Sequence, residues 1–493
     1  MSSDSNLQAL LLSLGKILSL LISFIVPIFL VRVLTKSDYG LYNQFNMIFL
    51  FLSMVFSFGI RSNLLYFYKV LPKEKVRIAL FQTVIALLCF SIIAALISIN
   101  DVVNVYIVGQ NELRGYINLI VLAVILQMFS NLAETLYIVR KDMLVSMFYP
   151  ALSVILKAVI VLSMVIAFQT LEAAIIAILI TLLILFLITL LYVLFELKAL
   201  PGKMLVDFKL FQDQLYYCLP FGISTAIREV SNKFDKLISI SFLSTANYAS
   251  LAVASTPIPG VMAIYDSLVQ VYLMEMVEPY KKKEFSKVIS IYQNLVSKST
   301  SFTIPLCVLF VFFADFLIPL LFTEAYKDAV DLFRVYIVSF LFTVLASDVV
   351  LRSSGETKLI LRGNSYALIL SIPFTYYSIV HFGALGAVLG AVFSVISSTI
   401  FLLYYNIKLL DTRISDFFPW KNIATITGIT CLAFIPLYIH SHYFDVTLFS
   451  FLYCSCVFGA IIVVLEYRFD LLFIERELID KYLKKLNISV RFQ

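Results

Sequence analysis

Charged residues are scarce in this sequence. Asp, Glu, Lys and Arg make up 14% of the 493 residues, whereas about 25% is usual for a soluble domain. Hydrophobic residues reach 61%, and the mean hydropathy is +0.98. This composition excludes an ordinary soluble protein and predicts an integral membrane protein. The apolar runs are long and uninterrupted, which favours transmembrane helices over a membrane β-barrel.

Residues that bind metal ions are also few. The chain has three histidines and six cysteines, and the cysteines show no CxxC or Cys/His spacing. His440 and His442 are neighbours, but no third ligand lies near them in the sequence. We therefore expect no metal site, no cofactor and no catalytic residues.

The apolar runs predict an all-α membrane protein with about fourteen transmembrane helices of about 20 residues each. The eighth contains Pro257, Pro259 and Gly260, which predict a kinked or broken helix and a candidate hinge. The expected spans are 7–31, 41–60, 78–99, 116–138, 144–168, 171–195, 215–243, 247–274, 295–314, 330–351, 359–380, 383–407, 420–439 and 446–465.

Lysine and arginine placement supports this count. With both termini in the cytoplasm, 27 of the 37 Lys and Arg residues lie in cytoplasmic segments, 4 in outer loops and 6 within spans. Such an excess is the positive-inside pattern of a multi-pass protein. It also accounts for the net charge of +6, so nothing indicates a nucleic-acid partner. The outer loops are too short for a folded domain.

The two halves of the chain resemble each other. Leu34–Tyr39, after the first span, matches Leu243–Tyr248, after the seventh. A repeat of six helices relates the halves by a pseudo-two-fold axis along the membrane normal. The predicted parts are a six-helix bundle (1–213), a second six-helix bundle (214–410), two additional helices (411–466) and a basic cytoplasmic tail (467–493).

The segment Leu215–Ser244 is unusual because it is mostly apolar yet carries five charges. On a helix these five side chains share an arc of about 160°. Facing lipid, each would cost about 2.5–3.5 kcal/mol, so we expect the arc to line a water-filled cavity. The alternative is an amphipathic helix on the membrane surface, but this would invert the later loops. The charged residues are Arg228, Glu229, Lys233, Asp235 and Lys236.

Four segments resemble the Wzx-type polysaccharide flippases of the multidrug/oligosaccharidyl-lipid/polysaccharide exporter superfamily. They are Phe29–Phe45, Asn232–Ala252, Ile318–Val335 and His381–Val392. The resemblance implies translocation of undecaprenyl-diphosphate-linked oligosaccharides across the bacterial inner membrane. Implied partners are this lipid-linked oligosaccharide, membrane lipids and other membrane proteins of polysaccharide assembly. We expect a monomer.

A diphosphate and a glycan require cations in a polar cavity. We expect Lys16, Arg228, Lys233 and Lys236 to contact the substrate, with structural ion pairs as the alternative. The further cavity or coupling candidates are Lys157, Glu229, Asp235 and Asp266. Of these, Asp266 is the best acidic candidate for a coupling proton or Na⁺, or it pairs with a lysine of the seventh span.

Other functions remain to be weighed. A cation-coupled multidrug exporter of the same superfamily tends to use an acidic residue in its first helix, where this chain has Lys16 and no acid. A lipid II flippase differs only in its substrate. A polymerase or glycosyltransferase acting on lipid-linked sugars usually needs a larger outer loop, so we expect no enzyme. A purely structural membrane protein would not need a span with five charges.

Overall fold

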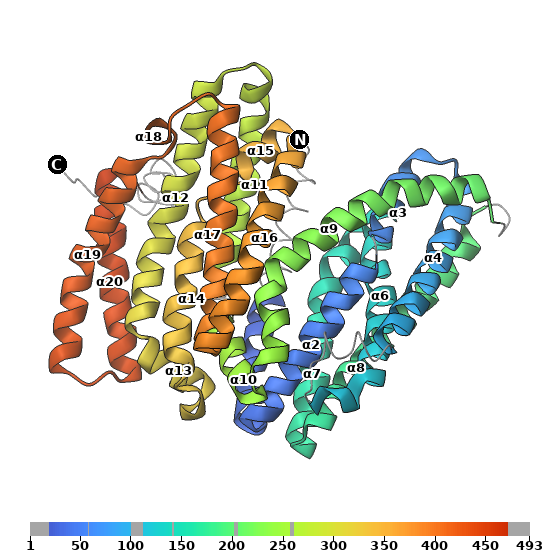
Figure 1. The fold of residues 1–493 in the computed structure, drawn as a ribbon, viewed down its shortest axis with the longest axis horizontal. Helices are drawn as coiled ribbons and strands as arrows, with labels where there is room; N and C mark the ends of the chain where they lie inside the picture. Colours follow the sequence, from blue (N-terminus) through green and yellow to red (C-terminus); the bar gives the residue numbers. More distant parts are fainter. Residues whose placement is uncertain are drawn as a thin grey trace, which may run out of the picture. The chain divides into compact units, whose positions relative to one another are not determined.

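A computed structural model describes residues 19–57, 59–99, 112–140, 142–201, 206–256 and 261–471, and the regular elements in these ranges are helices (Figure 1). Lys16, the segment 257–260 and the tail beyond Leu471 lie outside the described residues. The predicted all-α class is confirmed.

After a first helix at Ser19–Val33, the N-terminal half contains α2 (Lys36–Phe56), α3 (Ile60–Val70), α4 (Lys73–Ile99), η1 (Glu112–Tyr116), α6 (Ile117–Arg140), α7 (Met143–Phe168), α8 (Leu171–Ala199), α9 (Phe208–Phe242) and α10 (Thr245–Ala254). The remainder contains α11 (Val261–Lys281), α12 (Phe285–Phe312), α13 (Ala314–Phe322), η2 (Glu324–Tyr326), α14 (Ala329–Thr343), α15 (Val349–Ser354), α16 (Thr357–Phe382), α17 (Ala384–Leu409), α18 (Ile414–Phe417), α19 (Trp420–Tyr443) and α20 (Leu448–Phe469).

Among the described residues, eight helices are long and apolar enough to cross a membrane. The chain is therefore a multi-pass helical membrane protein, while the number fourteen stays a prediction. The eight segments are Lys73–Leu96, Glu112–Arg140, Phe148–Phe168, Leu171–Ala199, Phe285–Phe312, Ala384–Leu409, Trp420–Tyr443 and Leu448–Phe469.

Two predicted spans are interrupted. The predicted span 247–274 is divided, because α10 ends at Ala254 and α11 begins at Val261, which confirms the expected break. The hinge role of Pro257, Pro259 and Gly260 stays a prediction. The predicted span 330–351 is also divided, because α14 ends at Thr343 and α15 begins at Val349, with Ala346 between them at a φ of 48°. The predicted span 41–60 agrees with α2 as far as Phe56, and a second helix, α3, begins at its predicted end, after Gly59 with a φ of 65°.

Side-chain caps explain where several helices begin. Thr35 accepts a hydrogen bond from the Asp38 amide (3.1 Å) at the start of α2. Asp207 accepts one from Leu210 (3.1 Å) at the start of α9. Such caps satisfy amide groups that have no partner within the helix. The Ser, Thr and Asp residues between apolar runs therefore set the helix boundaries.

Packing divides the structure into two compact units. Unit 1 is Met1–Gly260 with Thr375–Ala387, and unit 2 is Val261–Phe374 with Val388–Gln493. In unit 1, α6 packs on α2, α3, α4, α7 and α8, while α9 packs on α2, α3 and α4 (Figure 1). Because α9 and α10 pack on α2, this division falls after the predicted boundary at 213. The predicted six-helix repeats are defined by symmetry rather than by packing, and they stay a prediction.

Gly40 allows α2 and α10 to approach each other closely. A Cβ atom at this position would lie 1.9 Å from the backbone oxygen of Thr245. No side-chain rotation relieves a clash with backbone, so the two helices would have to separate. A glycine is therefore required here for packing.

We expect Gly40→Ala to destabilise the protein by about 3 kcal/mol, in the upper range for overpacking. The matched control is Gly428→Ala in α19, where an added Cβ meets no atom within 4 Å. Thermal unfolding in detergent should show a lowered midpoint for the first variant and an unchanged or raised one for the second. Equal midpoints for the two variants would contradict the packing argument.

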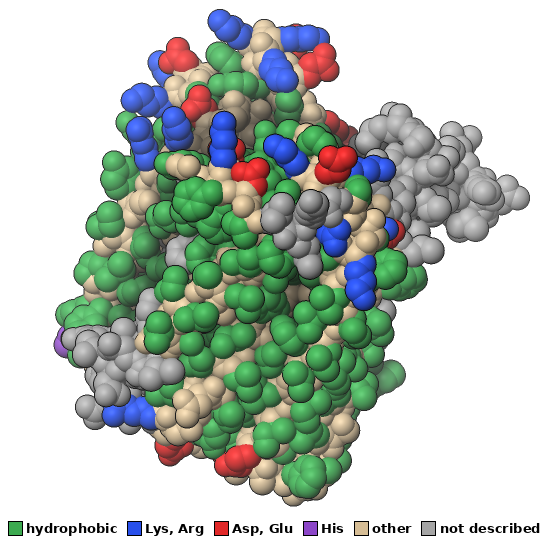
Figure 2. Space-filling model, turned by 90° about the vertical axis from the view of Figure 1, so that its right-hand side faces the viewer, with side chains coloured by type: hydrophobic (Ala, Val, Ile, Leu, Met, Phe, Trp, Pro, Cys, Tyr) green, Lys and Arg blue, Asp and Glu red, His purple; other side chains and the backbone are tan. Residues whose placement is uncertain are grey.

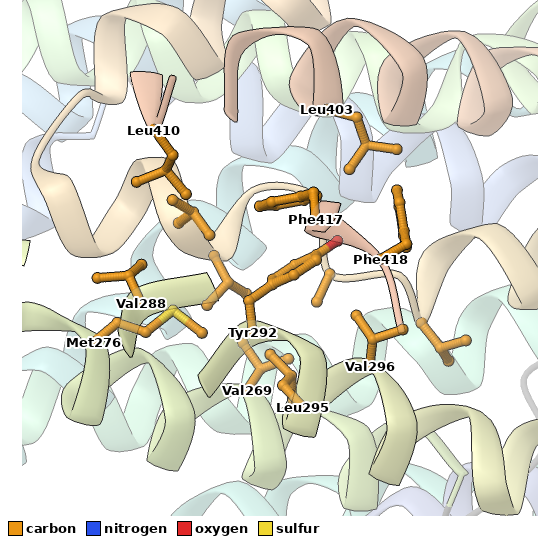
Figure 3. Close-up of a cluster of buried hydrophobic side chains, with 14 of the residues drawn as sticks. Val269, Met276, Val288, Tyr292, Leu295, Val296, Leu403, Leu410, Phe417 and Phe418 are labelled. Atoms are coloured by element: carbon orange, nitrogen blue, oxygen red, sulfur yellow. The ribbon is translucent and has the colours of Figure 1, made fainter. Parts of the chain in front are cut away.

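The core of unit 2 is organised around Tyr292 of α12 (Figure 3). Its ring is fully buried and stacks on Phe417 of α18, with ring centroids 4.3 Å apart. Its hydroxyl donates a hydrogen bond to the Leu345 carbonyl at 2.7 Å. Gln293, next in the chain, donates to the Asp416 carbonyl at 2.8 Å. The short α18 is thus held firmly against α12.

The surface has the distribution of side chains expected in a bilayer. Figure 2 shows a broad area of hydrophobic side chains, with Lys and Arg gathered at the upper end of the view. Many large apolar side chains of the molecule are exposed, for example Leu191 (68% exposed) and Leu96 (67%). An apolar area of this extent is unfavourable in water, so it is the lipid-facing surface.

Candidate functional site

The long helix α9 carries the charged segment singled out by its sequence. It extends over 35 residues, from its Asp207 cap to Phe242, and it bends along its length (Figure 1). Its sequence contains Pro220, which lacks a backbone donor and is a common cause of a helix bend. The charged residues follow this proline, in the second half of the helix.

Glu229 and Lys233 form an ion pair within α9. The Lys233 Nζ lies 3.2 Å from Glu229 Oε2, as the i, i+4 spacing predicts. The Lys233 side chain is 34% exposed and the Glu229 side chain 14%. The expected i, i+4 contact is therefore present, but whether this pair is purely structural or also contacts substrate stays a prediction.

Asp235 and Lys236 differ in how deeply they lie. Asp235 is 8% exposed, and its carboxyl interacts electrostatically with Lys236 and with the buried Tyr248 of α10. Lys236 is half-buried and is attracted by Asp235 but repelled by Lys233. Asp235 thus faces packed protein, whereas Lys233 and Lys236 are partly exposed cations on α9.

The remaining predicted residues are placed less completely. Arg228 belongs to α9, and its contact with substrate stays a prediction. Lys16 lies outside the described residues. Asp266 is exposed on α11 in unit 2, so its roles as coupling residue or lysine partner stay predictions.

Lys157 is a half-buried cation within the membrane part of unit 1. Its Nζ on α7 donates a hydrogen bond to the Asn46 Oδ1 on α2 at 3.3 Å. The Asn46 Nδ2 in turn donates to the Tyr42 carbonyl at 2.8 Å, which fixes the amide. Lys157 thus has the amide of Asn46 as a polar neighbour, and its role as a cavity or coupling residue stays a prediction.

Sequence reasoning overlooked a pair of amide side chains on α6. The Gln127 Nε2 donates to the Asn131 Oδ1 at 2.9 Å, and both residues are partly exposed. They lie in the middle of an apolar span, where polar residues normally face a bundle interior or water. The i, i+4 spacing of two amides within such a span was the signal that could have found them.

A second overlooked feature is the network around Glu196 of α8, at the end of the helix that leads into a predicted cytoplasmic segment. The Glu196 side chain is 2% exposed; the Arg140 Nη1 lies 2.6 Å from its Oε2, and the Tyr68 hydroxyl donates to its Oε1. Asp142 lies 3.9 Å from the Arg140 Nε and accepts a hydrogen bond from Tyr192 at 3.0 Å. This network joins the ends of α3, α6 and α8.

At the opposite ends of the helices, unit 1 has a cavity of about 610 Å³. The Tyr116 hydroxyl donates to the Glu172 carboxylate at 3.0 Å in its wall. Within the described residues, no group of three His, Cys, Asp or Glu side chains is arranged to hold a metal ion. The cavity is lined by Asp38, Leu41, Glu112, Gly115, Tyr116, Gln169, Thr170, Leu171 and Glu172.

Comparison with known proteins identifies the family of this chain. Residues 29–331 match the model of a family described as polysaccharide biosynthesis protein, which confirms the resemblance seen in the sequence. No curated protein matches the chain in sequence.

Solved structures show a similar fold at low sequence identity. The lipid II flippase MurJ, in an inward closed conformation, aligns with a TM-score of 0.76 and 14% identity over 93% of this chain and 98% of that one. An inward-facing multidrug resistance MATE family transporter of the MOP superfamily aligns with a TM-score of 0.62 and 14% identity over 80% of this chain and 94% of that one. A MOP superfamily transporter from Pyrococcus furiosus, described as having a binding pocket of reversed polarity, aligns with a TM-score of 0.54 and 14% identity over 82% of this chain and 95% of that one.

Proposed function

Because the chain belongs to the polysaccharide biosynthesis protein family, we propose that it is a flippase for undecaprenyl-diphosphate-linked oligosaccharides. It would move repeat units across the bacterial inner membrane for O-antigen, capsule or exopolysaccharide assembly. The observation that carries this proposal is the half-buried pair of cations, Lys233 and Lys236, on a helix of a multi-pass membrane protein. A diphosphate has two negative charges, and ammonium groups of partial exposure match them.

The proposed mechanism is alternating access around a cavity lined by α9. Arg228 and Lys16 would add cations to this cavity. The end of α10 at Ala254 and the start of α11 at Val261 support Pro257, Pro259 and Gly260 as the hinge of this motion. Both termini would be cytoplasmic, and the protein would act as a monomer without a cofactor. Other membrane proteins of polysaccharide assembly would receive the flipped product.

Two other transport functions have specific support. The likeness to MurJ favours a lipid II flippase, which carries the same type of diphosphate-linked lipid with a different glycan. The likeness to a MATE transporter favours a cation-coupled multidrug exporter, with Asp266 as its candidate coupling residue. The family match favours the polysaccharide substrate over both.

The test is the lipid-linked oligosaccharide pool of a strain that lacks this protein and has no redundant flippase. We expect sugar-loaded carrier lipid to accumulate on the cytoplasmic side, together with loss of surface polysaccharide. Plasmid-borne wild-type protein should reverse both effects. An unchanged pool and an unchanged surface would reject the proposal, and Asp266 would become the residue to test in drug export.

A further inference from the structure

Three helices of unit 1 place polar side chains at one depth in the membrane. The cavity of about 610 Å³ is lined by residues from the start of α2, from η1 before α6 and from the turn after α7, so these helix ends lie at one level. From that level, Asn46 is ten residues along α2, Gln127 ten along α6 and Lys157 eleven back along α7. At about 1.5 Å per residue, all three lie about 15–17 Å deep, near the middle of a hydrocarbon core about 30 Å thick.

The contacts of these residues agree with this common depth. Lys157 donates to Asn46 at 3.3 Å, which joins α7 to α2. Gln127 donates to Asn131, one turn further along α6, at 2.9 Å. Since α6 packs on both α2 and α7, the polar residues belong to one bundle.

These side chains carry more hydrogen-bond donors and acceptors than the hydrogen bonds given above use. An ammonium group has three donors, and Lys157 uses one of them on Asn46. The Gln127–Asn131 bond uses the Gln127 amide nitrogen and the Asn131 amide oxygen, so the Gln127 oxygen is an acceptor and the Asn131 nitrogen a donor for other groups. All four residues are partly exposed. In hydrocarbon such groups are strongly unfavourable, which favours a position facing water over one facing lipid.

We propose that Asn46, Gln127, Asn131 and Lys157 form a glycan-binding layer in the middle of unit 1, distinct from the cations of α9. This inference rests on the proposed function, because it assigns these residues to the sugar part of the same lipid-linked substrate. Amide groups donate and accept hydrogen bonds, as sugar hydroxyls do, and the ammonium group of Lys157 adds a stronger, charge-assisted donor. The diphosphate of the same substrate would bind the cations of α9.

The experiment compares two probes in liposomes that contain the purified full-length protein. One is the lipid-linked oligosaccharide extracted from the strain that encodes it, and the other is the same carrier lipid bearing a single sugar. In Lys157→Met and Gln127→Leu, transfer of the oligosaccharide should fall about tenfold, as expected for the loss of one or two polar contacts. Transfer of the single-sugar lipid should stay within about twofold of wild type.

Ser163→Ala on α7 is the matched control, because Ser163 is exposed and its hydroxyl donates to the Ile160 carbonyl of its own helix. Thermal unfolding verifies that each variant is folded. Equal losses for both probes, or no loss for either, would overturn the glycan-binding layer.

Calorimetric binding of the free oligosaccharide separates this inference from the proposed function. Wild-type protein that binds the oligosaccharide but transfers neither lipid would refute the flippase, and weaker binding by Lys157→Met would still support the layer. Wild-type protein that does not bind the free oligosaccharide, or that binds it as strongly as both variants do, would overturn the layer whatever the transport result.

Discussion

Lys236→Met is expected to lower transport of the lipid-linked oligosaccharide by at least about tenfold, since a charge-assisted contact with phosphate is worth about 1.5–3 kcal/mol. Lys236 is a half-buried cation whose attraction to Asp235 is opposed by repulsion from Lys233. Its ammonium group is therefore only partly compensated within α9. The measurement is transfer of the labelled lipid in liposomes, with the amount of inserted protein determined alongside.

The control for this experiment is Lys282→Met. Lys282 forms an i, i+4 pair with Glu278 at 2.7 Å, but both side chains are exposed in the α11–α12 hairpin. The same loss of charge should leave transport unchanged there, because the pair is screened by water. If Lys282→Met and Lys236→Met reduce transport equally, the effect is one of general charge and the proposed role of Lys236 is wrong.

A charge exchange tests the neighbouring pair. In Glu229→Lys/Lys233→Glu the ion pair of α9 is kept but reversed, so a purely structural pair should retain transport. If Lys233 contacts the diphosphate, the exchange should lose transport about as strongly as Lys233→Met. The two interpretations of this pair therefore predict opposite results for one variant.

The second large effect concerns stability. Arg140→Met should destabilise the protein by about 3 kcal/mol, because it leaves the carboxylate of Glu196, 2% exposed, without its cation at 2.6 Å. The double variant Arg140→Met/Glu196→Met should recover most of this loss, since it removes the buried charge as well. Thermal unfolding in detergent measures both.

Arg334→Met provides the comparison for Arg140. The Arg334 side chain is 33% exposed, close to the 32% of Arg140, but its partners Asp315 and Asp331 are 65% and 86% exposed. Its loss should cost at most about 1 kcal/mol, as for a surface ion pair. Similar destabilisation by both single variants would show that burial of Glu196 does not determine the effect.

Features that depend on neighbouring residues could be predicted from the sequence. Apolar runs of membrane length gave the helical class, and Pro257 and Pro259 indicated the break between α10 and α11. The i, i+4 spacing of Glu229 and Lys233 indicated their ion pair. Each of these follows from the geometry of one helix, so no knowledge of packing is needed.

The polar layer could not be recognised in this way. Lys157 looked isolated in its span, and its partner Asn46 is 111 positions away. Gln127 and Asn131 carry no charge, so they stood out less than the residues of α9. Likewise, Glu196 lay at the edge of a predicted loop, and only the fold shows that it is buried against Arg140.

The sequence by itself determined that this is a multi-pass helical membrane protein of the polysaccharide biosynthesis family, with a charged helix at 215–243, which the structure extends to Phe208–Phe242. The tertiary structure decided which polar side chains meet: Lys157 with Asn46, and Glu196 with Arg140 and Tyr68. Composition and periodicity act within one helix. Burial and hydrogen bonding between helices depend on how apolar faces pack across long separations in the chain, and many pairings of similar apolar helices have nearly the same local pattern.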